Sequence, residues 1–279
     1  MRIFRTIDEL QFFLRKIKLS GKKVGFVPTM GALHEGHLYL IKRSKAENEV
    51  TVCSIFVNPT QFNDKSDFKK YPRVLDSDIP MLEEVGCDIL FIPDTEEIYR
   101  GHQDITPDLL GLEGKWEGAF RPGHFNGVVQ IVYLLLKAVE PDRLYMGLKD
   151  FQQQAIIGRL IQSLNLNVEL IPVEIIREPS GLAMSSRNAR LSGEQRAEAA
   201  IIHETLQWAA EEIRNGVPVE EILAQSRQRL KLPGTELEYL EYCRQDNLDR
   251  MTHYSPEIGS VILVAIWWGK VRLIDNEEV

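Results

Sequence analysis

The sequence predicts an α/β fold in which a parallel sheet is wound with helices on both faces, followed by a smaller α+β domain. Short apolar runs of strand length alternate with helical patterns through the first 176 residues, which is typical of a parallel sheet. Polar stretches follow several of these runs, as expected where ligands bind at the carboxyl ends of the strands. Beyond about Arg177 the alternation stops, so we place one domain at residues 1–176 and a second at residues 177–279.

Hydrophobic periodicity predicts the elements of the first domain. Strands are expected at residues 22–27, 50–57, 88–92, 143–146 and 168–173. Helices are expected at residues 6–19, 34–48, 79–85, 126–139 and 151–164. Pro28 has no N–H donor and should therefore end the first strand. A polar loop is expected after Phe62, and residues 101–123, rich in Gly, Pro and charge, predict an irregular surface segment.

The second domain should combine helices with a β-hairpin. Ser192 and Gln195 form a capping-box pattern, which predicts a long helix from there to about Asn215. A further helix is expected at residues 219–230. Strands are expected at residues 237–243, 260–268 and 271–274, with Gly269-Lys270 as the turn between the last two.

Composition limits the possible functions. The 279 residues carry a net charge of −8, which argues against a nucleic-acid binder because a phosphate backbone demands a basic face. The longest apolar run, residues 261–268, is too short to span a bilayer, and the charged first residues do not fit a secretory signal. Three scattered cysteines fit buried thiols in a reducing compartment. We therefore expect a cytoplasmic protein with no nucleic-acid or membrane partner.

The stretch from Pro28 to His37 joins the first strand to a helix and places two histidines in the joint. If the helix begins at or just before His34, then His34 and His37 share one helical face. A helix N-terminus has free backbone N–H groups and a positive dipole end, so this position predicts a phosphate site. Gly31 and Gly36 lack a Cβ and should let a large ligand approach the backbone.

The histidine pair has two other interpretations. One is a metal site, although the spacing is one residue shorter than in the zinc-protease helix and no third ligand is evident. The other is a pair of partly buried histidines that cap the helix. We favour the phosphate site, because imidazole rings can donate hydrogen bonds to a phosphoryl group that gains charge in its transition state. His37 can also donate a proton to a departing oxygen.

Further polar stretches are expected at the same edge of the sheet. Met184 to Arg187 places two hydroxyls and a guanidinium in a flexible linker, which is either an ordinary loop or a second phosphate clamp. Lys149 would supply another positive charge to a triphosphate that loses pyrophosphate. Asp150 can hold Lys149 or a ribose in place, or cap the following helix, and these roles can coexist.

Gln61 and Gln153 are neutral amides expected on separate strand-end loops. Each alone is explained by solvation. Two converging amides, however, suit a small hydroxy acid or amino acid, because they recognise hydroxyl and carboxylate groups without neutralising them. His124 is interpreted as a packing or capping residue, and we assign it no catalytic role.

Together these stretches resemble the pantothenate synthetase (pantoate–β-alanine ligase) family over almost the whole chain. The matching stretches occur in order along the sequence: Pro28 to His37, Val57 to Phe62, Tyr71 to Arg73, Arg121 to Phe125, Lys149 to Gln153, Gly181 to Asn188 and Arg272 to Asn276. The resemblance implies a Rossmann-type nucleotidyltransferase domain with a small C-terminal lid, as a homodimer. It also implies two reaction steps. ATP and pantoate, with Mg²⁺, give pantoyl adenylate and pyrophosphate, and the β-alanine amine then attacks the adenylate to give pantothenate and AMP.

The resemblance also implies residue roles. His37 is the catalytic acid, with His34, Lys149 and Arg187 as further catalytic residues. Gln61 and Gln153 bind pantoate, and Gln61 also lies near β-alanine. The implied nucleotide-binding residues are Met30, Gly31, Ala32, Leu33, His34, Glu35, Gly36, His37, Gly147, Leu148, Lys149, Asp150, Ile176, Met184, Ser185, Ser186 and Arg187. The Mg²⁺ ligands stay open, because ATP phosphates and water can supply most of its coordination shell.

The chain departs from the family pattern at Leu148, where Glu is usual, at Gln130, where Thr is common, and at Arg190, where Tyr is frequent. Nucleotide affinity or lid closure can therefore differ, while the reaction type should not. Two alternatives to a ligase remain. Nucleotidyl transfer onto a phosphorylated acceptor would need extra Lys or Arg where this chain has Gln61 and Gln153. A nucleotide-binding protein without catalysis would keep only the fold.

Overall fold

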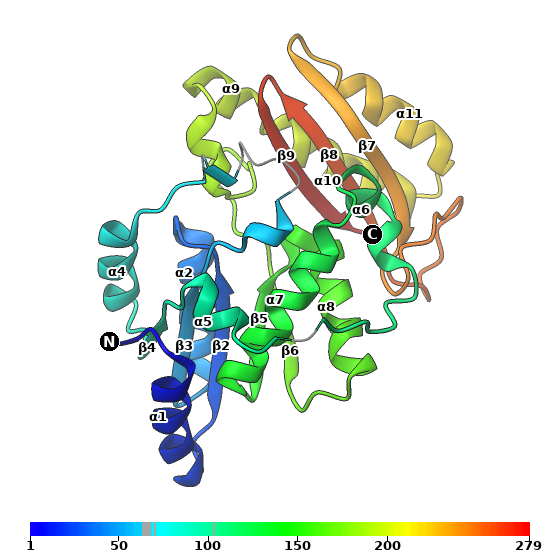
Figure 1. The fold of residues 1–279 in the computed structure, drawn as a ribbon. Coiled ribbons are helices and arrows are strands. Elements are labelled where there is room, and N and C mark those ends of the chain that lie inside the picture. Colours follow the sequence, from blue (N-terminus) through cyan, green and yellow to red (C-terminus); the bar gives the residue numbers. More distant parts are fainter. Residues whose placement is uncertain (63–67, 70, 103) are drawn as a thin grey trace.

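The structure, a computed structural model, describes residues 1–62, 68–69, 71–102 and 104–279 and contains a parallel and an antiparallel sheet (Figure 1). The six strands of the parallel sheet lie in the order β1-β4-β3-β2-β5-β6. The order runs outward from β2 through β3 and from β5 to β6, so the topological switch point lies between β2 and β5. Its strands are β1 (Arg2–Phe4), β2 (Val24–Thr29), β3 (Val50–Ile55), β4 (Ile89–Phe91), β5 (Arg143–Gly147) and β6 (Glu169–Val173).

Helices cover both faces of the parallel sheet, which confirms the predicted fold class. Neighbouring strand residues point to opposite faces, so Val52 packs in the core under one group of helices and Cys53 in the core under the other. The first group contains α1 (Ile7–Leu19), α7 (His124–Val139) and α8 (Phe151–Ser163). The second contains α2 (Glu35–Glu47) and α4 (Leu75–Glu84). The short helices α5 (Thr95–Tyr99) and α6 (Trp116–Phe120) lie in the connections.

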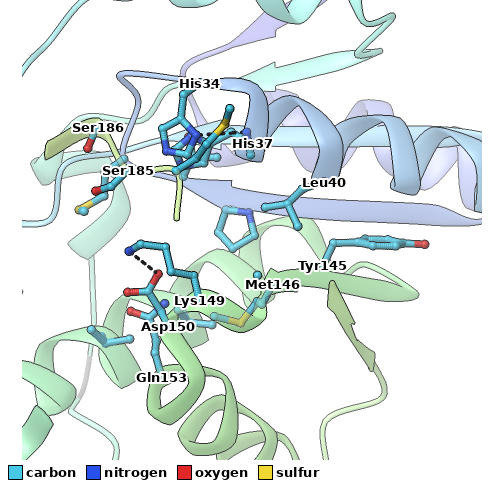
Figure 2. Close-up of a pocket in the computed structure, with 18 of the residues that line it drawn as sticks. His34, His37, Leu40, Tyr145, Met146, Lys149, Asp150, Gln153, Ser185 and Ser186 are labelled. Atoms are coloured by element: carbon cyan, nitrogen blue, oxygen red, sulfur yellow. Dashed lines mark hydrogen bonds and ion pairs between the residues drawn. The ribbon is translucent and has the colours of Figure 1, made fainter. Parts of the chain in front are cut away.

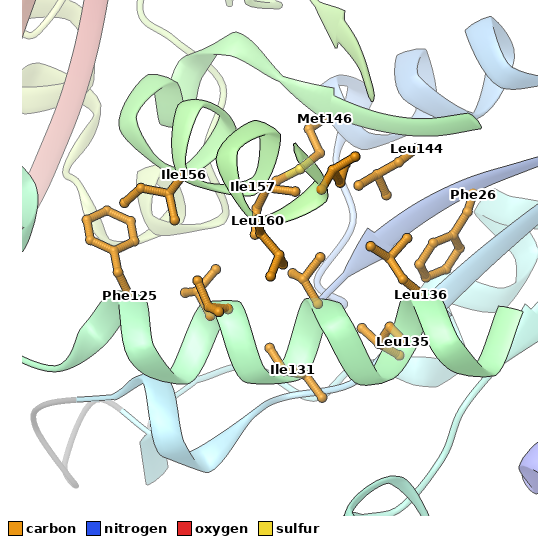
Figure 3. Close-up of a cluster of buried hydrophobic side chains, with 14 of the residues drawn as sticks. Phe26, Phe125, Ile131, Leu135, Leu136, Leu144, Met146, Ile156, Ile157 and Leu160 are labelled. Atoms are coloured by element: carbon orange, nitrogen blue, oxygen red, sulfur yellow. The ribbon is translucent and has the colours of Figure 1, made fainter. Parts of the chain in front are cut away.

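The apolar face of α7 is the centre of the larger core (Figure 3). Many of its side chains lie between α8 and the sheet, with Phe125 near Ile156 at one end of the contact and Leu136 near Phe26 and Leu144 at the other. Because apolar side chains fill both sides of this contact, α7 is held firmly against α8 and the face of the sheet.

Pro28 does not end the first strand, contrary to the sequence prediction. It lies inside β2 and is paired with Ser54 of β3. The carbonyl of the next residue, Thr29, accepts from Phe56 N–H, so Pro28 faces the other neighbour, β5. The ladder between β2 and β5 runs only from Gly25 to Phe26, so no hydrogen bond is lost at Pro28.

Other differences come from short or tightly turned elements. The three-residue strand β1 was not predicted, the expected irregular segment at 101–123 contains α6, and α4 begins earlier than expected. The expected long helix is divided into α9 (Gly193–Glu198) and α10 (Ile201–Arg214). Ala200 N–H bonds to Ala197 and Ile202 N–H to Ala199, which is the tighter 3₁₀ pattern. Most of the polar loop expected after Phe62 lies outside the described residues.

The antiparallel sheet consists of β7 (Thr235–Arg244), β8 (Ser260–Trp268) and β9 (Val271–Glu278), with the predicted turn at Gly269-Lys270. One face packs on α10 and α11 (Val219–Arg229) through residues such as Val264 and Leu273. The other face, which includes Leu263 and Ile274, joins the core of the parallel sheet. The hydrophobic core therefore continues across the predicted domain boundary at residue 176.

Candidate active site

A cavity of about 240 Å³ lies beyond the carboxyl ends of β2 and β5, at the switch point of the sheet. Segments far apart in the sequence meet there, as the strand-end polar stretches predicted. The predicted residues that line it are Met30, His34, Gly36, His37, Gln61, Gly147, Lys149, Asp150, Gln153, Ile176, Met184, Ser185, Ser186 and Arg187. Gly31, Ala32, Leu33, Glu35 and Leu148, also expected at the nucleotide, are not among the lining residues.

The two histidines lie together on one side of the cavity, opposite Lys149 and Asp150 (Figure 2). His34 is the N-cap of α2, and its Nδ1 accepts from Gly36 N–H at 3.2 Å. The proton of a neutral His34 ring is therefore on Nε2. The His37 ring lies one turn further, with ring centroids 4.1 Å apart, and its Nδ1 is buried without a hydrogen-bond partner in the described chain. The predicted shared face of the pair is confirmed.

Both imidazoles are neutral at pH 7. Burial and the positive charge of Lys149 lower the pKa of His34 to about 4. Burial, with smaller effects of His34 and Lys149, lowers the pKa of His37 to about 3. A neutral imidazole still has one N–H to donate, but it has no additional proton to release. The pair therefore consists of two neutral hydrogen-bond donors.

The backbone around the histidines is less open to an anion than the sequence predicted. The N–H groups of Gly36, His37 and Leu38 all donate within the turn that starts at His34. The space at Gly36 is filled by the His34 ring, since a Cβ there would lie 2.9 Å from its Cε1. At Gly31 the same atom would meet Asp78 and Ile55, each at 3.0 Å. These glycines make room for protein atoms, and a bound anion would meet side chains more than helix N–H groups.

Asp78 of α4, which sequence reasoning missed, holds the histidine loop in place. Its carboxylate is 1% exposed and accepts from Ala32 N–H at 2.9 Å and from Leu33 N–H at 2.8 Å. Ala32 and the preceding Gly31 both have positive φ, of 51° and 78°, which is costly for a residue with a side chain. The two charge-assisted hydrogen bonds stabilise this conformation. Asp78 lies 45 and 46 residues beyond these partners, so no local pattern connects them.

Lys149 and Asp150 belong to the 3₁₀ turn η3 (Leu148–Asp150) after β5. Asp150 is the N-cap of α8, but its side chain makes no capping hydrogen bond, so the capping alternative is wrong. Its Oδ2 instead lies 3.8 Å from Lys149 Nζ. The ammonium and carboxylate therefore both face the cavity, where they are available to a ligand (Figure 2).

The Met184 to Arg187 segment, expected in a flexible linker, leads into regular backbone structure. Residues Ser186–Arg190 form the 3₁₀ helix η4, and Ser185 caps it by accepting from Arg187 N–H at 3.2 Å. Asn188, 3% exposed, donates to Glu178 at 2.7 Å and to the Ala183 carbonyl at 3.0 Å. The clamp alternative therefore has a fixed backbone to act from.

Gln61 and Gln153 both reach the cavity, from different elements. Gln61 ends the 3₁₀ turn η1 (Pro59–Gln61), and Gln153 lies in the first turn of α8, within the helix expected at residues 151–164 and not on a strand-end loop. The Gln61 carbonyl accepts from His124 Nδ1 at 2.7 Å, which fixes the turn against α7. Burial and the charge of Arg121 lower the pKa of His124 to about 4. His124 is thus a packing and hydrogen-bonding residue, as interpreted from the sequence.

One wall of the cavity is apolar, a feature that sequence reasoning missed. It is formed by Val128, Ile131 and Leu135 of α7, with Met146 and Leu40 from other elements. The sequence signal was the apolar character of α7, whose apolar residues cover more of the helix surface than packing against one core would require. The site therefore combines a cationic and hydrogen-bonding side with an apolar side.

Within the described residues no group of three or more His, Cys, Asp or Glu side chains lies close enough to hold a metal ion. The helices of the described chain include none of the length and apolarity that crossing a bilayer requires.

Comparison with known proteins gives one consistent result. The family model described as pantoate-beta-alanine ligase matches residues 2–278. A pantothenate synthetase from Bacteroides fragilis is 47% identical over 99% of this chain and 98% of its own, and one from Bacteroides thetaiotaomicron is 45% identical with the same coverage. The crystal structure of a pantothenate synthetase from Thermus thermophilus has a TM-score of 0.92 at 39% identity, covering 99% of both chains. That of a Francisella tularensis pantoate-beta-alanine ligase, complexed with beta-gamma ATP and beta-alanine, has a TM-score of 0.81 at 36% identity, covering 99% of this chain and 97% of the other.

Proposed function

The chain belongs to the pantoate–β-alanine ligase family, and from that membership we propose that it condenses pantoate and β-alanine to pantothenate, with ATP converted to AMP and pyrophosphate. The observation that carries the proposal is the convergence of His34, His37 and Lys149 with Gln61 and Gln153 around one cavity. A triphosphate and a small hydroxy acid would both find matching partners there.

The first step that we propose is adenylation. A pantoate carboxylate oxygen attacks the α-phosphorus of ATP, and the bond from that phosphorus to the β-phosphate oxygen breaks, which gives pantoyl adenylate and pyrophosphate. Lys149 and Arg187 are assigned to the departing pyrophosphate, because both line the cavity beside Ser185 and Ser186. Negative charge accumulates on the leaving group, so fixed cations there stabilise the transition state.

His34 and His37 are assigned to the phosphoryl oxygens. His34 Nε2 carries the proton that its neutral ring retains, so it can donate without any protonation step. The pKa of His37, about 3, favours hydrogen-bond donation over the acid role that the resemblance implies. A bound triphosphate would raise this pKa, since negative charge stabilises the imidazolium.

The pantoate would lie between the two glutamines and the apolar wall. Gln61 and Gln153 can donate to carboxylate and hydroxyl oxygens without adding charge. The two methyl groups of pantoate match the wall formed by Val128 and Ile131. In the second step the β-alanine amine attacks the acyl carbon and loses a proton, and the bond to the AMP oxygen breaks. No covalent enzyme intermediate is needed.

We propose that Mg²⁺ enters with the triphosphate. Since the described chain has no preformed cluster of metal-binding side chains, the donor set fits an ion that keeps phosphate and water ligands. Asp150 is the carboxylate beside Lys149 that can approach it. When bound, the ion would neutralise part of the phosphate charge. We also propose a homodimer in the cytoplasm, which light scattering and cell fractionation would test.

Isotope exchange tests the proposed reaction. We expect labelled pyrophosphate to enter ATP when pantoate is present and β-alanine is absent, because adenylation is reversible and precedes the amine. Release of AMP should need pantoate, β-alanine and ATP together. Transfer and retention of the nucleotidyl group on an acceptor would support the nucleotidyltransferase alternative. ATP binding with neither exchange nor AMP release would support the non-catalytic alternative and refute the proposal.

A further inference from the structure

Strand β9 connects the two parts of the molecule through alternating side chains. Arg272, Ile274 and Asn276 share the face that turns toward the parallel-sheet unit. Arg272 donates to both carboxylate oxygens of Glu117 in α6, at 2.8 and 2.7 Å, and Ile274 packs against the larger core. The intervening Leu273 packs in the opposite core, under α10 and α11. The face of Arg272, Ile274 and Asn276 is therefore the docking face of β9.

Asn276 makes the contact of this face that lies closest to the chemistry. Its Nδ2 donates to the Leu148 carbonyl at 2.8 Å and to the Lys149 carbonyl at 3.0 Å. An amide nitrogen carries two hydrogens, so each is used by one carbonyl. Both carbonyls belong to η3, the turn that carries Lys149 into the cavity. The side chain of Asn276 is 3% exposed, so water does not compete for these bonds.

The Asn276 amide is itself held by its neighbours. Its backbone N–H donates to Asp275 Oδ1 at 2.8 Å. Asp275 in turn accepts from the two terminal nitrogens of Arg177, at 2.7 and 3.1 Å, in a bidentate pair. Arg177 lies in the segment that leaves the parallel sheet, four residues beyond the end of β6 (Glu169–Val173), so this segment supports the end of β9. The amide therefore reaches η3 from a rigid support.

The Lys149 side chain, by contrast, is weakly held. Its Nζ is 3.8 Å from Asp150 Oδ2, which is beyond hydrogen-bonding distance. The position of the Lys149 ammonium therefore depends on the position of the η3 backbone. A shift of this turn by about 1 Å would move the charge away from a phosphate and slow the reaction strongly.

We propose that Asn276 is a positioning residue for Lys149: its two hydrogen bonds hold η3 so that the ammonium meets the leaving pyrophosphate. The C-terminal part of the chain then contributes to adenylation without touching the nucleotide. The inference rests on the proposed function, because the role of Lys149 is assigned there. It assigns to the Arg272–Asn276 stretch a function that the sequence resemblance alone did not supply.

The substitution Asn276→Asp tests this inference. It keeps the shape of the side chain but turns the donor into an acceptor that faces two carbonyl oxygens. We expect pantoate-dependent exchange of pyrophosphate into ATP to slow by about tenfold or more, because Lys149 is displaced in the first step. Attack of β-alanine on supplied pantoyl adenylate should stay within about twofold of the unsubstituted enzyme, since that step does not use Lys149.

Two controls separate positioning from general loosening. Ile274→Val weakens packing on the same strand face but leaves the amide in place, so it should lower the melting temperature without changing the ratio of the two half-reaction rates. In a Lys149→Met background, Asn276→Asp should have no further effect on exchange, because the two residues act through one charge. Asn276→Ala removes the donors without adding charge and provides the same comparison if the Asp variant does not fold.

The outcomes are distinct. Additive effects in the Lys149→Met background, or equal slowing of both half-reactions by Asn276→Asp, would overturn the positioning role. Failure of both Asn276 variants to fold would also count against it, because the amide would then be a general structural contact. An unsubstituted enzyme with no pyrophosphate exchange at all would refute the proposed function instead.

Discussion

The loop that carries the histidines should depend on Asp78, although this residue does not line the cavity. In Asp78→Asn the amide oxygen can keep one of the two backbone donors, Ala32 N–H or Leu33 N–H, while the amide nitrogen opposes the other. The loss of one charge-assisted hydrogen bond and the burial of one unpaired donor should cost about 3 kcal/mol of unfolding free energy. For a chain of this size that corresponds to a melting temperature lower by roughly 6 °C.

Thermal and urea unfolding would measure the effect, with Asp76→Asn as the matched control. Asp76 lies in the same first turn of α4 but is exposed, so its substitution should change the unfolding free energy by less than about 0.5 kcal/mol. The rate of pyrophosphate exchange should also fall about tenfold in Asp78→Asn but not in Asp76→Asn, because the backbone that precedes His34 is no longer held in place. Equal stability and equal exchange in the two variants would show that Asp78 does not hold the loop.

The remaining predictions concern the charge state and the role of His37. The pKa of His37 is about 3 in the folded protein and 6.5 in the unfolded chain. Above pH 6.5 the residue is neutral in both states, so it adds no pH dependence to stability. Below pH 6.5 the unfolded chain binds a proton at His37 that the folded protein does not bind, so stability falls. Between pH 6.5 and pH 5 this should lower the free energy of unfolding by on the order of 2 kcal/mol. Urea unfolding of His37→Gln should lack that part of the decline. Identical pH profiles of the two proteins would contradict the burial argument. His37→Ala should slow adenylation by about 10²-fold and weaken ATP binding much less, whereas His37→Gln, which keeps an N–H donor, should retain more of the rate if donation is the role. A Gln variant as slow as the Ala variant would favour proton transfer.

The sequence was sufficient where the signal is local. The His34 cap, the shared face of His34 and His37 and the turn at Gly269-Lys270 each depend on residues within one turn of one another. The convergence of strand-end stretches also followed, because parallel strands of alternating βα units place their carboxyl ends at one edge. These features need no knowledge of distant contacts.

Other parts of the site could not be predicted because they depend on partners far along the chain. Asp78 is 45 residues from Leu33, and Asn276 is 127 residues from Lys149. Neither has a periodic or spacing signal of its own. Pro28 shows the same limit for the fold: whether a proline breaks a strand depends on which neighbour its missing N–H would face. At Pro28 the outcome depends on the length of the ladder between β2 and β5, which ends at Phe26.

The acid and donor roles of His37 are compatible once the charges of the site are considered together. Burial and the nearby Lys149 both favour the neutral ring, which limits the positive charge gathered at the cavity. A bound triphosphate would compensate Lys149 and add negative charge close to the ring, which removes one cause of the low pKa and opposes the other. The imidazole can therefore be a neutral donor when ATP enters and become a proton source only in the loaded complex. In this proposal Asn276 holds the turn that carries Lys149, and Asp78 holds the histidine loop. Both residues would then influence the distance between the ammonium and the imidazoles without lining the cavity themselves.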